Sequence, residues 1–386
     1  MSQIKTKRLY VIAGEASGDL HGSNLLREFI SQNNENESPL ELDIRFWGGD
    51  KMADVIGKTP VKHFKELAFM GFVEVLANIR TILKNIKFCK KDIEEFQPDA
   101  LLLIDYPGFN LRIAEWAKSK GIKIYYYISP TVWAWKESRV YKIKKVVDHL
   151  FVILPFEKPF YEKFDYSVEY YGHPLLDAIN DYKKVPFNRT LFIKENNLSH
   201  QAIIAILPGS RKQEIRLKLP VMLNAVKVFN NYQIVIAGAP GLDPSYYQEF
   251  IHSESVKILH GKTYDLLSAS EAAVVTSGTA TLETALLDIP EVVCYKTSGI
   301  SYAIAKRLVK IKFISLVNLI MDKEVVKELI QHACNESSIR NELGQILIDG
   351  KKRESMLNEY HEMKKILGGG GASRKVAQSM LKTIQH

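Results

Sequence analysis

The chain has 386 residues, long enough for two α/β domains, and 46% of them are hydrophobic and 25% charged, as in ordinary folded proteins. Lysine and arginine outnumber aspartate and glutamate by 52 to 44, and the net charge of +8 favours anionic ligands or surfaces. The three cysteines have no metal-site spacing, and no apolar run approaches the roughly 18 residues that span a membrane. We therefore expect neither a zinc site nor a transmembrane helix.

The first half of the sequence alternates short apolar runs with helical patterns, which is typical of an α/β domain. The predicted strands are Arg8–Ala13, Asp43–Trp47, Asp99–Ile104, Ile122–Tyr127 and His149–Leu154. The turn Gly14–Asp19 follows the first strand and leads into a helix from about Leu20 to Phe29. This turn has the position of a ligand-binding loop, although it lacks both the GxGxxG spacing and the P-loop lysine.

A very apolar segment, LAFMGFVEVL at Leu67–Leu76, leads into a helix with a basic face. This combination is typical of an interfacial membrane anchor, and the alternative is a core helix with a solvated basic stripe. The membrane-contact residues that we predict are Leu67, Phe69, Met70, Phe72, Val73, Leu76, Arg80, Lys84 and Lys87.

Asp105 stands at the carboxyl tip of a strongly apolar strand, where α/β enzymes place reactive groups. The alternative is a cap on the helix that begins near Leu111. Further along, Trp133 and Trp135 follow the next strand, and they either stack on a sugar or pack their own loop.

The strand–loop–helix rhythm restarts after a polar region, so we predict two domains. The predicted boundaries are 1–175 for the first domain, 176–200 for a linker, 201–350 for the second domain and 351–386 for C-terminal helices. Gly368–Gly371 is a hinge that allows the last helix, Ala372–Ile384, to pack on the first domain or on a partner chain.

The second half repeats the α/β pattern. Its predicted strands are Ala202–Leu207, Tyr232–Ala237, Val256–Leu259, Ala272–Val275 and Glu291–Tyr295, and its helices include Ile215–Phe229, Ala280–Leu287, Ser301–Lys312 and Lys323–Ile330. Pro220 within the first of these helices predicts a break or a late helix start.

Two turns in the second half are candidate phosphate sites, Pro208–Arg211 and Thr276–Thr279. Each joins a strand to a helix N-terminus, where free N–H groups and the helix dipole favour phosphate. Gly209 allows close approach of the backbone, and Arg211 offers a bidentate guanidinium for a diphosphate. Glu283 lies one helical turn after Thr279, where a carboxylate accepts both hydroxyls of a ribose; an ordinary crossover with hydroxyl capping is the alternative.

These features predict two Rossmann-like doubly wound domains facing a cleft, an α/β arrangement of the glycosyltransferase B type. No Asp-x-Asp pair for a metal is present, so a diphosphate leaving group would be neutralised by arginine, N–H groups and a helix dipole. We expect no metal and no cofactor, with a sugar nucleotide as substrate.

The motifs in this order resemble those of the lipid-A-disaccharide synthases, almost from end to end. Besides LAFMGFVEVL, the resemblance rests on Ala13–Gly22, Ile104–Asn110, Ser129–Trp135, Leu154–Tyr161, Gly172–Leu175, Leu207–Ile215, Ser277–Glu283, Ala305–Lys310 and Glu328–Gln331. It implies transfer of 2,3-diacylglucosamine from UDP to the 6-hydroxyl of 2,3-diacylglucosamine 1-phosphate with inversion at the anomeric carbon.

The resemblance also implies roles for single residues. Asp105 matches the family's essential acidic residue and is the expected general base, and Arg211 matches a functionally important arginine. The remaining expected binding residues are Ser17, Gly18, Asp19, Gly209, Ser210, Ser277, Gly278, Thr279, Glu283 and Asn318. Two positions depart from the family pattern: Gly108 replaces a second acid, and Val317 replaces a proline beside Asn318.

Acylated substrates imply a peripheral location on the cytoplasmic face of the inner membrane, with an anionic surface as partner. The sequence gives no reason to expect nucleic acid, and it allows a homodimer. The alternative functions are a UDP-N-acetylglucosamine-using transferase or epimerase with a soluble substrate, and a UDP-sugar-binding protein without turnover. The apolar LAFMGFVEVL segment is unnecessary for a soluble acceptor, and a pure binding protein needs no base.

Overall fold

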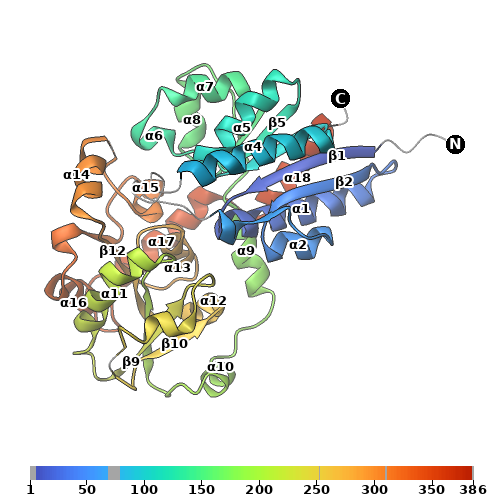
Figure 1. Ribbon diagram of the computed structural model, residues 1–386. Helices are drawn as coiled ribbons and strands as arrows, with labels where there is room; N and C mark the ends of the chain where they lie inside the picture. Colours follow the sequence, from blue (N-terminus) through green and yellow to red (C-terminus); the bar gives the residue numbers. More distant parts are fainter. Residues whose placement is uncertain (1–5, 68–78, 252, 309–310, 385–386) are drawn as a thin grey trace. The chain divides into compact units, whose positions relative to one another are not determined.

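The computed structural model describes residues 6–67, 79–251, 253–308 and 311–384 (Figure 1). The chain divides into two compact units, one formed by Met1–Ala178 with Gly370–His386 and the other by Ile179–Gly369. Within the described residues each unit contains one parallel sheet, of seven strands in the first and six in the second. The two-domain α/β architecture predicted from the sequence is confirmed.

The first unit has the sheet order β3-β2-β1-β4-β5-β6-β7. Its strands are β1 (Thr6–Ala13), β2 (Glu41–Gly48), β3 (Lys62–His63), β4 (Ala100–Ile104), β5 (Lys123–Tyr127), β6 (His149–Val152) and β7 (Glu169–Tyr170). Its helices are α1 (Ala16–Glu35), α2 (Asp50–Ile56), the 3-10 turn η1 (Phe64–Glu66), α4 (Ile79–Phe96), α5 (Pro107–Ser119), α6 (Val132–Trp135), α7 (Arg139–Val146), α8 (Glu157–Glu162) and α18 (Ala372–Ile384).

Alternation along β1 builds a core on both faces of this sheet. Leu9 and Val11 pack in one apolar cluster, which also contains residues of α1 and α18, whereas Tyr10 and Ile12 pack in another with residues of α4 and α5. All four side chains are fully buried, as expected for a strand covered by helices on both sides.

The second unit has the order β10-β9-β8-β11-β12-β13. Its strands are β8 (Ala202–Leu207), β9 (Tyr232–Gly238), β10 (Lys257–His260), β11 (Ser270–Thr276), β12 (Glu291–Tyr295) and β13 (Lys327–Ile330). Its helices are α10 (Arg189–Glu195), α11 (Lys212–Val226), η2 (Pro244–Tyr247), α12 (Thr263–Ala269), α13 (Thr279–Leu286), α14 (Gly299–Leu308), α15 (Leu316–Met321), η3 (Gln331–Ala333), α16 (Glu336–Gly344) and α17 (Arg353–Leu367).

Two predictions about the second unit are wrong. Lys323–Ile330 is not a helix, because Lys327–Ile330 pairs with β12 as the edge strand β13. Pro220 neither breaks nor delays its helix, because α11 begins at Lys212 and runs through the proline.

The chain passes between the units at Ala178–Ile179 and again at Gly369–Gly370. The predicted linker region 176–200 carries α9 (Pro174–Lys183) and α10, and the predicted C-terminal region is divided, with α17 in the second unit and α18 in the first. Helix α18 packs against α1 (Figure 1). The Asp177 carboxylate accepts N–H groups of Gly371 and Ser373 and so anchors the start of α18.

Candidate active site

The sheet of the first unit reverses its strand order between β1 and β4. Chain segments leave these neighbouring strands toward opposite sides, and open α/β sheets generally bind ligands at the carboxyl ends of such strands. Glu15 follows β1, and Asp105 follows β4 directly. The predicted location of Asp105 at a strand tip is therefore correct.

Asp105 is held in an unusual backbone conformation. It has φ +45° and Tyr106 has φ +49°, two consecutive left-handed residues that are not glycine and cost on the order of 1–3 kcal/mol each. Hydrogen bonds maintain this turn, since the Asp105 carbonyl accepts the Asn110 side-chain amide at 2.8 Å and the Tyr126 hydroxyl at 2.6 Å. These two hydrogen bonds thus hold the backbone of Asp105 in place.

The protonation of Asp105 is shifted toward neutral pH. Its pKa is raised from 3.8 to about 7, mainly by burial and also by the nearby Glu15 charge, although a hydrogen bond from the Tyr106 backbone lowers it. A carboxyl group with a pKa near neutrality exchanges protons at working pH, as a general base or acid must.

A second buried carboxyl group, Glu157, was not among the residues predicted for the site. Its carboxylate accepts the N–H groups of Ile153 at 3.0 Å and Leu154 at 2.9 Å, and the Trp133 indole N–H at 3.2 Å. Burial raises its pKa to about 7, and the charge of Asp105 contributes. The signal that could have found it was its place in the LPFEKPFY motif.

The two tryptophans of the SPTVWAW segment differ in their surroundings. Trp133 packs its ring edge-on against Phe156 and donates to Glu157, so it packs the loop. Trp135 is 41% exposed, with the Arg139 guanidinium 4.3 Å from its ring centroid.

Of the three residues predicted to bind ligand in the first turn, Asp19 has three hydrogen-bonding partners in the protein backbone. Asp19 is buried, and its carboxylate accepts the backbone N–H groups of Gly49, Lys51 and Met52, so it holds the start of α2. Gly18 is buried as well, and an added Cβ would lie 3.3 Å from that of Ala13. Close packing of α1 against the strand ends explains this glycine, and Ser17 alone is partly exposed.

The second unit has its own reversal of strand order, between β8 and β11. The turns Pro208–Arg211 and Thr276–Thr279 follow these two neighbouring strands, so the structure brings the two predicted phosphate turns to one edge of the sheet. Ser210, Arg211, Gly278 and Thr279 are exposed there. This is the crevice position of the second sheet.

The turn Pro208–Arg211 depends on Gly209 and Glu214. Gly209 has φ +114°, and an added Cβ would lie 2.5 Å from the Glu214 carboxylate, so glycine is required. Glu214 accepts the Ser210 N–H at 3.2 Å and pairs with the Arg211 guanidinium at 3.4 Å.

Ser277 and Glu283 already have partners within the second unit. The Ser277 hydroxyl donates to the Ile314 carbonyl at 3.0 Å, and the Tyr264 hydroxyl donates to one oxygen of Glu283 at 2.8 Å. Burial raises the pKa of Glu283.

Asn318, which the sequence predicts to bind the nucleotide, has hydrogen-bonding partners within the second unit. It is fully buried, and its amide oxygen accepts the N–H groups of Val325 and Val326. Its amide nitrogen donates to the Val326 carbonyl and to Glu328, each at 2.9 Å. All of its hydrogen-bonding capacity thus serves the connection between α15 and β13.

The predicted membrane segment is described only at its ends. Leu67 is fully buried in the core of the first unit, so its predicted membrane contact is wrong. Phe69, Met70, Phe72, Val73 and Leu76 lie outside the described residues.

The basic end of this segment is exposed. Arg80, Lys84 and Lys87 are exposed on α4, and so are the large apolar side chains Leu83 (53%) and Phe88 (44%). Across the described parts of the chain, helices are too short or too polar to span a bilayer.

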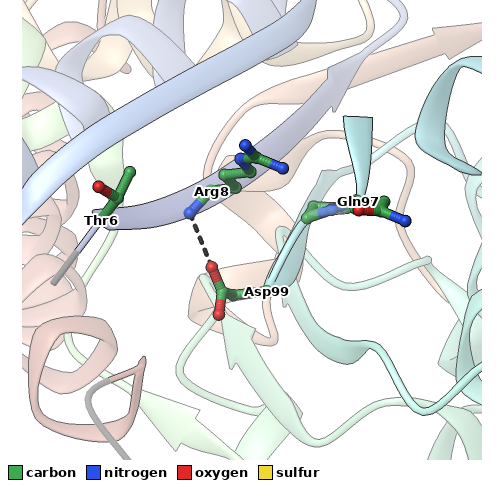
Figure 2. Close-up of a pocket in the computed structure, with 5 residues that line it drawn as sticks. Thr6, Arg8, Gln97 and Asp99 are labelled. Carbon is green, nitrogen blue, oxygen red and sulfur yellow. Dashed lines mark hydrogen bonds between the residues drawn. The ribbon is translucent and has the colours of Figure 1, made fainter. Parts of the chain in front are cut away.

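A surface hollow in the first unit lies away from these residues. Figure 2 shows it, lined by Thr6, Arg8, Gln97, Pro98 and Asp99, with the Arg8 N–H donating to Asp99 at 2.8 Å. These residues belong to the amino ends of β1 and β4, opposite to Asp105. Among the described residues no three His, Cys, Asp or Glu side chains gather as metal ligands.

Comparison with known proteins gives consistent results over the whole chain. A family profile described as Lipid-A-disaccharide synthetase matches residues 9–383. The lipid-A-disaccharide synthase of Syntrophus aciditrophicus is 37% identical over 390 residues, covering 99% of both chains. That of Nitrosococcus oceani is 37% identical over 378 residues, covering 95% of this chain and 94% of the other.

Solved structures resemble the fold at much lower sequence identity. A UDP-GlcNAc 2-epimerase from Neisseria meningitidis bound to UDP-GlcNAc has a TM-score of 0.65 at 13% identity, covering 98% of this chain and all of the other. A putative UDP-N-acetylglucosamine 2-epimerase from Listeria monocytogenes has a TM-score of 0.66 at 12% identity, covering 99% and 97%. These likenesses concern the fold alone.

Proposed function

The chain belongs to the lipid-A-disaccharide synthase family, and from this premise we propose which of its residues act in catalysis and which bind the donor. The protein is a glycosyltransferase of lipid A biosynthesis. It transfers 2,3-diacylglucosamine from UDP to the 6-hydroxyl of 2,3-diacylglucosamine 1-phosphate and releases UDP. The first unit supplies the general base, and the second unit holds the donor nucleotide.

Asp105 takes the proton in this proposal. The acceptor 6-oxygen forms a bond to the anomeric carbon of the donor as the bond from that carbon to the diphosphate oxygen breaks. The bonding electrons leave with UDP, and the 6-hydroxyl proton passes to the Asp105 carboxylate. The observation that carries this assignment is an aspartate with a pKa of about 7, fixed at the switch point of the sheet.

The turns of the second unit bind UDP. Arg211 and the N–H groups of Ser210, Gly278 and Thr279 neutralise the diphosphate, which stabilises the leaving group without a metal. Glu283 accepts a ribose hydroxyl through the carboxylate oxygen that Tyr264 does not use. This role is supported by the shared edge of the two turns and by the exposure of Arg211.

The base assignment is tested by mass spectrometry of the product formed in detergent by wild type and by Asp105→Asn. The amide keeps the shape but accepts no proton, so the disaccharide phosphate should form on the order of 10²–10⁴ times more slowly. Equal UDP binding by both proteins controls for folding. A wild-type rate from the variant would remove Asp105 as base, whereas UDP binding without product from either protein would favour the alternative functions.

We also propose that α4 brings the enzyme to the cytoplasmic face of the inner membrane. Arg80, Lys84 and Lys87 are exposed beside Leu83 and Phe88, a composition suited to an anionic interface. Flotation with vesicles containing one third anionic lipid should recover wild type, but not a variant with glutamate at the three basic positions.

The matched control for flotation carries glutamate at three exposed lysines of the second unit, Lys194, Lys227 and Lys257. It has the same net charge as the α4 variant and should still float. If both variants fail to float to the same extent, net charge, and not α4, is responsible for membrane binding. Sedimentation of the same samples tests the homodimer that the sequence allows.

A further inference from the structure

The predicted phosphate turn Pro208–Arg211 of the second unit already contacts a carboxylate of its own chain, that of Glu214. Glu214 is the third residue of α11, and its carboxylate accepts the Ser210 N–H at 3.2 Å and the Arg211 guanidinium at 3.4 Å. A glutamate at this helix position satisfies N–H groups that would otherwise lack a partner. The two groups that Glu214 contacts are those expected to bind the donor diphosphate.

A second cation, the ammonium group of Lys218, lies on the same helix as Glu214. Lys218 lies four residues further along α11, one helical turn away, and is only 2% exposed. Burial lowers its pKa, while the charge of Glu214 opposes this shift. Among the residues described, no hydrogen bond or ion pair is found for the Lys218 ammonium group, which leaves it available to a carboxylate that moves.

We propose that Glu214 occupies the diphosphate position in the empty enzyme and moves from Arg211 to Lys218 when the donor binds. The proposal rests on the proposed function, since it requires that the turn Pro208–Arg211 binds the diphosphate. Glu214 is then a positioning residue: it keeps Arg211 oriented while the turn is empty, and it competes with the donor. The buried Lys218 stabilises the displaced carboxylate.

Isothermal titration with UDP tests this exchange, with four proteins: wild type, Glu214→Gln, Lys218→Met and the double variant. Glutamine still accepts the Ser210 N–H but has no charge to compete, so Glu214→Gln should lower the Kd for UDP about 3- to 10-fold. Lys218→Met removes the second partner of the carboxylate and should raise the Kd several-fold. In the Glu214→Gln background, the same lysine substitution should have no effect, because no carboxylate needs the ammonium group.

Steady-state kinetics add a readout that a structural role would not change. The KM for the donor should follow the Kd for UDP, while the KM for the acceptor stays at the wild-type value. The proposal is overturned if Glu214→Gln binds UDP no tighter than wild type, or if Lys218→Met acts equally in both backgrounds. An Arg211→Met variant tests the proposed UDP site separately from the movement of Glu214: if the variant leaves UDP affinity unchanged, the proposed UDP site itself fails.

Discussion

The pKa of Asp105 can be changed without touching Asp105. Its pKa is about 7 instead of 3.8, with burial as the larger cause and the Glu15 charge as the second. Replacing Glu15 by glutamine removes the charge and keeps the shape, so the pKa of Asp105 should fall below about 7, while burial keeps it above 3.8.

The expected effect on activity follows from the deprotonated fraction of the base. A general base works only without its proton, so wild-type kcat/KM should fall as the pH drops through about 7. At pH 6 only about one tenth of Asp105 is deprotonated in wild type, so the lower pKa in Glu15→Gln should raise kcat/KM at this pH. Above pH 8 both enzymes are deprotonated, and the weaker base should make the variant equal or slower.

The assay is UDP release between pH 5 and pH 9 with both acylated substrates in detergent. Glu35→Gln is the matched control, because Glu35 is an exposed acid at the other end of α1, and its pH profile should overlie that of wild type. If the midpoint of the acidic limb of the Glu15→Gln profile stays near pH 7, the Glu15 charge does not raise the pKa of Asp105. A midpoint at higher pH would mean that Glu15 lowers this pKa.

Three further predictions concern stability. Asn318→Ala should lower the free energy of unfolding, measured with urea, by about 3 kcal/mol, because the N–H groups of Val325 and Val326 and the Val326 carbonyl lose their partner. If titration shows that UDP affinity falls by more than the stability does, Asn318 has a ligand role. Asp19→Ala should cost on the order of 3 kcal/mol by the same measurement because two buried N–H groups and one part-buried N–H group lose their acceptor, and an unchanged urea midpoint would contradict this. Burial raises the pKa of Glu291 well above its usual range, so the stability that it contributes is present below about pH 4.3 and is lost as pH rises toward the folded-state pKa. Glu291→Gln should therefore gain stability relative to wild type between pH 5 and pH 8, and an equal difference at both pH values would argue against a titrating Glu291.

The sequence predicted most elements of the fold because apolar runs at strand length, separated by helical patterns, have few other solutions in an α/β protein. Its failures have local causes. Lys327–Ile330 has a mixed pattern and becomes a strand only because β12 offers it an edge. Pro220 lies in a helix that tertiary packing maintains despite the missing N–H.

The candidate site was likewise predicted only in part from the sequence. Motif spacing placed Asp105 and the turn Pro208–Arg211 at strand ends, and the order of the strands in each folded sheet puts them at the switch points. For Asp19 and Asn318 the structure shows hydrogen bonds to backbone N–H groups that the motifs did not predict. A short polar side chain beside a ligand loop serves either the ligand or the loop, and only the three-dimensional placement of donors around each side chain decides between them.

The sequence by itself therefore determined the fold class and the family, and it led to Asp105 as the proposed base. Only the tertiary structure decided the charge state of that base, since its pKa depends on burial and on Glu15, a residue 90 positions away in the chain. It also revealed Glu157 and the Glu214 contact with the phosphate turn. Electrostatic energies and hydrogen bonds depend on distance in space and on solvent exclusion, and neither can be read from spacing along the chain.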